Sequence, residues 1–256
     1  MELIHVAPGG DYARYEELTL KKDQYEKEAD QIHIAYLREF GELMTESFQL
    51  KVDCIALKKE IALYVKAANT GTAITPEEVE AHLKVQMAGY YEELQQMIDE
   101  WQEGKRSKSI SFYEAEQIKK IYRRLAKQLH PDISPLTAEY PALGELFNRV
   151  LIAYRCNDLK ELQKLEVLVN KELEDNGVEG FNMVIPDISE RIEELERDIE
   201  AIVTSAPYSY KSLLRDPDTV AEKKAELHKE IDEYAAYKQE LTVKRDEMKG
   251  RAKADG

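Results

Sequence analysis

The chain has 256 residues, 34% of them charged, and its formal net charge is −15 at pH 7. So acidic a chain lacks the basic surface that phosphate backbones require, which argues against general nucleic-acid binding. Its two cysteines, Cys54 and Cys156, lack the spacing of a zinc site, and no uninterrupted apolar run is long enough to cross a bilayer. We therefore expect a cytoplasmic protein that is neither secreted nor membrane-spanning, with no metal and no cofactor.

Residues 1–104 are predicted to form a helical hairpin of the coiled-coil type. From about Glu16 to Ala68 there is no proline and one glycine, and apolar residues recur every seven positions. These are Ala29, Tyr36, Leu43, Leu50, Leu57 and Tyr64, with Cys54, Ile61 and Ala68 as a second row. Such a helix needs a partner, and Thr75-Pro76-Glu77-Glu78 has the capping-box pattern that begins a second helix, which runs to about Glu103.

The next segment joins a basic amphipathic helix to a tripeptide that ends it. On a helical wheel, Ile118, Ile121, Tyr122, Leu125 and Leu129 share one face. The basic residues Lys119, Lys120, Arg123, Arg124 and Lys127 fall on the opposite side. Pro131 cannot extend a helix and disfavours helical geometry at His130, so the chain leaves the helix at His130-Pro131-Asp132.

A second amphipathic helix follows after a short connection. Apolar residues recur at spacings of three and four at Leu143, Phe147, Val150, Leu151 and Tyr154. Two helices with so short a connection are expected to lie antiparallel, with their apolar faces together.

These residues resemble the J-domain family of co-chaperones, in the simplest class, where the domain is set into coiled-coil sequence. The family's helix II carries a Tyr-basic-basic-Leu-Ala core that ends in His-Pro-Asp, and its helix III carries a Phe followed seven residues later by a Tyr. The matches here are Tyr122-Arg123-Arg124-Leu125-Ala126, His130-Pro131-Asp132, and Phe147 with Tyr154. The resemblance covers about 45 residues of a module that we place at residues 105–175, with a helix III that continues past Tyr154.

Three features of the family are missing from this chain. The usual Tyr-Tyr-x-x-Leu-Gly opening is absent, and Tyr90-Tyr91-Glu92-Glu93-Leu94 is our candidate for the helix that replaces it. Ile133 stands where a basic residue is common. There is no glycine/phenylalanine-rich linker after helix III and no Cys-x-x-Cys repeat, so the substrate-binding parts of full-length DnaJ are lacking.

The C-terminal part predicts another antiparallel hairpin, over residues 180–250. Pro186-Asp187-Ile188-Ser189-Glu190 has a capping-box pattern. A first apolar row follows at Ile188, Ile192, Leu195, Ile199 and Ile202, and a second at Val220, Leu227, Ile231, Tyr234, Leu241 and Met248. Residues 251–256 are expected to be a disordered tail. The predicted fold class is therefore all-α: a J-domain-like antiparallel helix pair flanked by long helical hairpins.

The resemblance implies a non-catalytic co-chaperone that docks on a DnaK-type chaperone and stimulates its ATP hydrolysis. The predicted docking residues are His130, Pro131, Asp132, Tyr122, Arg123, Arg124, Lys119, Lys120 and Lys127. The basic face would attract an acidic partner surface, although solvated charge and simple helix capping by His130 are the plainer interpretations. The helical arms would target the protein or bind an unknown client. Their tyrosines are also compatible with a homodimer contact.

Two other functions are consistent with parts of the pattern. A coiled-coil scaffold with a degenerate module would account for the missing opening and for Ile133. An enzyme or nucleic-acid-binding protein could use the basic helix on phosphate, but the acidic remainder opposes this, and we find no catalytic constellation. We expect the protein not to be an enzyme.

Overall fold

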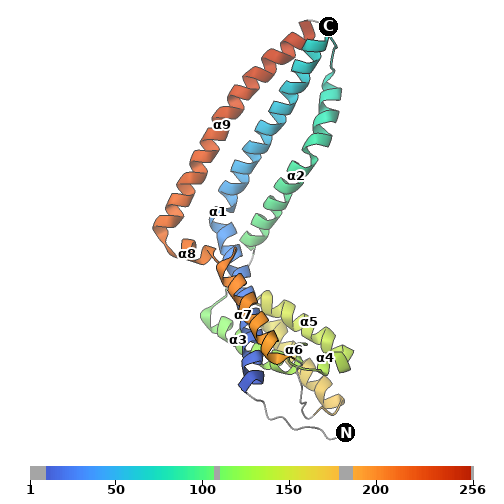
Figure 1. The fold of residues 1–256 in the computed structure, drawn as a ribbon, viewed down its shortest axis with the longest axis vertical. Coiled ribbons are helices and arrows are strands. Elements are labelled where there is room, and N and C mark those ends of the chain that lie inside the picture. The colour runs from blue at the N-terminus through green and yellow to red at the C-terminus, as the bar shows by residue number, and fades with distance from the viewer. Residues whose placement is uncertain (1–9, 107–109, 179–186, 255–256) are drawn as a thin grey trace. The chain divides into compact units, whose positions relative to one another are not determined.

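The computed structural model describes residues 10–106, 110–178 and 187–254. These residues contain nine helices and no strand, which confirms the predicted all-α class (Figure 1). The chain divides into two compact units. Unit 1 comprises residues 1–32 and 108–209, and unit 2 comprises residues 33–107 and 210–256. The long helix α1 (Gly10–Thr70) contributes its first part to unit 1 and its remainder to unit 2.

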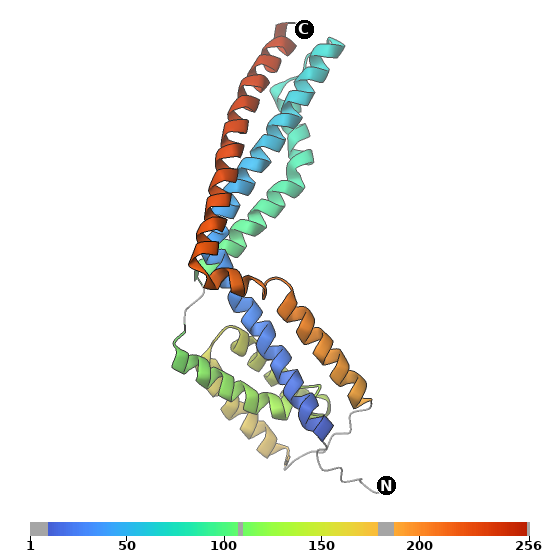
Figure 2. The same ribbon diagram turned by 60° about the vertical axis from the view of Figure 1, so that its left-hand side comes forward.

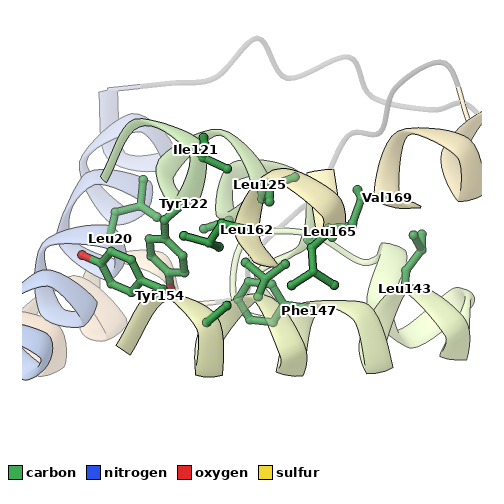
Figure 3. Close-up of a cluster of buried hydrophobic side chains, with 14 of the residues drawn as sticks. Leu20, Ile121, Tyr122, Leu125, Leu143, Phe147, Tyr154, Leu162, Leu165 and Val169 are labelled. Carbon is green, nitrogen blue, oxygen red and sulfur yellow. The ribbon is translucent and has the colours of Figure 1, made fainter. Parts of the chain in front are cut away.

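Unit 1 is built on α3 (Phe112–Leu129), α5 (Pro141–Arg155) and α6 (Leu159–Asp175), with the short α4 (Leu136–Glu139) between α3 and α5. Ser111 starts α3 with a capping box, since its hydroxyl accepts the Glu114 amide hydrogen while the Glu114 carboxylate accepts that of Ser111. The apolar faces of all three helices meet in one core (Figure 3). Side chains with almost no exposure in it are Ile118, Tyr122, Leu125, Ala126, Leu129, Ile133, Leu143, Val150, Leu162, Leu165 and Val169.

Helix α5 ends earlier than predicted. The sequence suggested one helix continuing past Tyr154, but α5 stops at Arg155 and α6 begins at Leu159. Asn157 adopts a left-handed conformation with φ of 57°, and the Asp158 carboxylate caps α6 by accepting the Glu161 amide hydrogen. This turn lets α6 pack back onto α3 and α5, which buries Leu162 and Leu165 in the shared core.

In unit 2, α2 (Pro76–Arg106) and α9 (Pro217–Ala254) run beside the second part of α1 (Figures 1 and 2). The short α8 (Tyr210–Arg215) precedes α9. Near one end, α1 contributes Tyr64 and Ala67 to a cluster with Val79 of α2 and Ala252 of α9. Because α1 has two neighbours here, its fully buried residues include Val52, which lies off both predicted heptad rows, as well as Phe40, which lies two heptads ahead of Cys54 in the second row.

The predicted C-terminal hairpin is contradicted, because its two helices belong to different units and each packs on α1. Helix α7 (Ile188–Thr204) belongs to unit 1, where Ile192 and Leu195 lie against Tyr15. Helix α9 belongs to unit 2, where Leu241 lies against Cys54 and Ile61 of α1.

Three smaller expectations also differ from the structure. Asp187 is left-handed with φ of 53° and makes no side-chain cap, so the expected capping box is not formed there. Helix α9 continues to Ala254, so the tail does not begin at residue 251. Tyr90 and Tyr91 lie exposed on α2 in unit 2, and they therefore add no helix to the module in unit 1.

Within the described part of the chain, no helix is both long and apolar enough to cross a membrane.

Gly41 tests the close approach of α1 and α2. A Cβ at this position would lie 2.6 Å from Trp101 Cδ1, so Gly41→Ala is expected to destabilise unit 2 by about 1–3 kcal/mol. At Gly89, also helical, nothing lies within 4 Å of an added Cβ, and Gly89→Ala is expected to stabilise by up to about 1 kcal/mol. Urea unfolding followed by circular dichroism measures both changes; equal effects of the two substitutions would contradict this packing.

Candidate protein-docking site

The tripeptide occupies the turn between α3 and α4. His130 has an extended conformation and its amide hydrogen is accepted by the Ala126 carbonyl, so it caps the end of α3. The His130 carbonyl then accepts the amide hydrogens of Ile133 and Ser134, which closes the turn. Pro131 and Asp132 are exposed on it. The helix therefore ends where the proline predicts.

The His130 imidazole is largely covered, with only 9% of the residue exposed. Its ring packs edge-on against Phe147 of α5, with 5.3 Å between the ring centroids. Nδ1 accepts the amide hydrogen of Asp132 at 3.2 Å, which leaves the ring proton on Nε2 in the neutral form. Nε2 faces the Asp23 carboxylate of α1, at 3.6 Å from Oδ2. The Nε2 edge of the imidazole thus faces α1.

Tyr122 is more deeply buried than His130, at 1% exposure. Its ring stacks on Tyr154 of α5, with 3.7 Å between centroids and 8° between planes (Figure 3). Its hydroxyl donates to Asp23 Oδ2 at 2.6 Å. Burial raises the pKa of both phenols, and the Asp23 carboxylate raises them further. Tyr122 is therefore a packing residue and a hydrogen-bond donor in this structure.

Residues Gly10–Ile32 of α1, which we call the covering segment, lie over this part of the module. Leu20 enters the core of the module and is 2% exposed. The Tyr12 hydroxyl donates to the Ile133 carbonyl at 2.9 Å. Lys27 lies over the Tyr154 ring, 3.9 Å from its centroid. The covering segment thus holds both the turn after the tripeptide and the aromatic pair.

Two of the predicted basic docking residues form ion pairs within unit 1. Lys127 pairs with Glu16 of the covering segment and Arg124 with Glu166 of α6, yet the two basic side chains remain 50% and 51% exposed. Lys120 is exposed and Lys119 and Arg123 are partly exposed. Over residues 10–106, 110–178 and 187–254, no acidic group forms an ion pair with these three. The basic face is therefore partly neutralised but accessible to solvent.

The sequence did not single out Asp23, Glu16 or Leu20, which contact the predicted docking residues. The sequence pattern that could have identified these three residues is weak, because the heptad row in α1 begins only at Ala29. Apolar residues do precede that row: Leu20 packs in the core of the module, Tyr15 packs with α7, and Tyr12 packs against both clusters.

Comparisons with protein-family models, curated proteins and solved structures found no match to this chain. In the described residues, no group of three or more His, Cys, Asp or Glu side chains is arranged to hold a metal ion.

Lys27 gives a pH-dependent test of the covering contact. Burial lowers the pKa of Lys27 to about 8, from an ordinary value of 10.5. Between pH 8 and 10.5 the unfolded chain thus binds more protons at this site than the folded chain, so this contribution makes the protein more stable as pH rises. Relative to Lys27→Met, the wild type is expected to gain about 1–2 kcal/mol in free energy of unfolding between pH 7 and pH 9.5.

Chemical unfolding at the two pH values measures the difference. Lys21→Met, at an exposed position on the same helix, is the control and should keep the pH dependence of the wild type. If the curves of the wild type and Lys27→Met run parallel, Lys27 is not desolvated.

Proposed function

We propose that unit 1 contains a J-domain-type module through which the protein acts as a non-catalytic co-chaperone of a DnaK-type chaperone. The observation that supports this most is the pairing of two separate sequence motifs across α3 and α5. Tyr122 stacks on Tyr154 and His130 packs on Phe147, so the two ends of one motif contact the two ends of the other in antiparallel order. If both segments matched the family by chance, their residues would not be expected to contact one another in this order.

The surface around the tripeptide has the chemistry that such docking needs. Pro131 and Asp132 are exposed at the end of a helix whose solvent side carries five basic residues. In a chain of net charge −15, this basic face is a local exception, and it suits an acidic partner surface. The partner would supply the ATP chemistry, and docking would favour its hydrolysis-competent state.

A single-turnover assay of ATP hydrolysis by a purified DnaK-type chaperone tests this proposal. We expect the intact protein to accelerate hydrolysis, and His130→Gln and Asp132→Asn to reduce that acceleration about tenfold or more. The Asp132 side chain is 56% exposed, so its substitution should leave folding intact. His228→Gln, at an exposed position on α9, is the control and should behave as the wild type. Equal stimulation by all four proteins would contradict a role for the tripeptide.

The basic face makes a separate prediction about salt. Docking affinity is expected to fall steeply as ionic strength rises, because exposed charges are screened. Lys120→Ala/Arg123→Ala should bind more weakly at low salt and should lose less affinity on salt addition. Lys84→Ala/Lys244→Ala removes two exposed charges from unit 2 and should follow the wild type. Fluorescence anisotropy across a salt series measures these slopes; an affinity independent of salt would remove the electrostatic part of the proposal.

A coiled-coil scaffold with an inactive module is the second candidate, and one observation favours it. Tyr122 and His130 are both covered by α1, as they would be if they served only for packing. Affinity purification from cell extract separates the candidates: a scaffold retains structural partners without enriching a DnaK-type chaperone.

A further inference from the structure

We infer that the covering segment, Gly10–Ile32 of α1, is an intramolecular competitor for the docking site, which becomes complete only when this segment detaches. This inference rests on the proposed function. Two of the predicted docking residues, His130 and Tyr122, face the same carboxylate of Asp23, and a third, Lys127, pairs with Glu16. Two carboxylates of the covering segment thus occupy His130, Tyr122 and Lys127, groups to which an acidic partner surface would bind.

The core of the module is supplied mainly by helices other than α1. The side chains with no exposure in this core come from α3, α5 and α6 and from Ile133, and Leu20 is the buried contribution of α1. Detachment would expose Leu20 and one side of the aromatic pair, but it would leave the contacts of α3 with α5 and α6 in place. The segment can therefore be released while the module stays folded.

Helix α7 lies on another face of the covering segment and forms a separate layer with it. Tyr15 packs with Ile192 and Leu195 in a cluster whose members come from α1 and α7 alone. Arg14 pairs with Glu196, and Lys22 with Asp198 at 2.5 Å. These contacts can persist when the segment leaves the module, so α7 would move together with it.

The contacts between the covering segment and the docking residues are of a kind that an acidic partner can replace. Tyr122 donates one hydrogen bond to a carboxylate, Lys127 forms one half-exposed ion pair, and the His130 ring faces a carboxylate. A partner that offers carboxylates to the same groups would compete for them directly. Its apparent affinity is then the intrinsic affinity reduced by the fraction of molecules with the segment detached.

Removal of the two acidic contacts tests this competition. In the single-turnover assay with a purified DnaK-type chaperone, Glu16→Ala/Asp23→Ala should lower the concentration of full-length protein that gives half-maximal stimulation by about threefold or more. The matched control Glu39→Ala/Glu42→Ala removes two carboxylates from the unit 2 part of the same helix, where they pair with Lys224 and Lys105. This control should leave the half-maximal concentration unchanged. An unchanged or higher concentration for the Glu16/Asp23 variant would overturn the inference.

Hydrogen exchange of the full-length protein, without chaperone, tests the segment independently of the proposed function. Glu16→Ala/Asp23→Ala should speed amide exchange in Gly10–Ile32 while exchange in α3, α5 and α6 stays slow. Faster exchange throughout unit 1 would mean that the segment is an integral part of the core, and would overturn the inference. Should no protein stimulate the chaperone while exchange is faster only in the segment, the proposed function fails but the detachable segment stands.

Discussion

The antiparallel contact between α3 and α5 determines where every predicted docking residue lies. The contacts of Tyr122 with Tyr154 and of His130 with Phe147 belong to one apolar interface, which also includes Leu125, Val150 and their neighbours. Because this interface occupies one side of α3, its lysines and arginines must face outward. Because Pro131 ends α3 at the edge of the same interface, the tripeptide is held at a turn rather than within a helix.

The Asp23 carboxylate connects this interface to the rest of unit 1. It lies near two groups that sequence reasoning assigned to an external partner, the Tyr122 hydroxyl and the His130 imidazole. The Asp23 side chain is only 13% exposed, and a carboxylate so largely removed from water needs such partners, because its desolvation is costly unless hydrogen bonds or opposite charge compensate. In the detached state that we propose, the same two groups would be available to an external acid.

Covering of the docking residues is compatible with both candidate functions, and they differ in what the covering segment does. In a scaffold, Leu20 and Asp23 complete a permanent core. In a co-chaperone, the same contacts set the fraction of molecules competent to dock, which makes the first part of α1 a regulatory element. The second part of α1 lies in unit 2 between α2 and α9, so one helix serves two structural roles.

The sequence by itself determined the helical class, the end of α3 at Pro131, the start of α2 at its Thr75–Glu78 capping box, and the apolar and basic faces of α3. These features depend on residues a few positions apart, where backbone geometry dictates the outcome. Only the tertiary structure decided which helix each apolar row contacts. Periodicity shows which face is buried but not against what, so α7 and α9 were paired with each other although each packs on α1. Asp23 was missed for the same reason: its contact with Tyr122 joins residues 99 positions apart, and no local pattern encodes it.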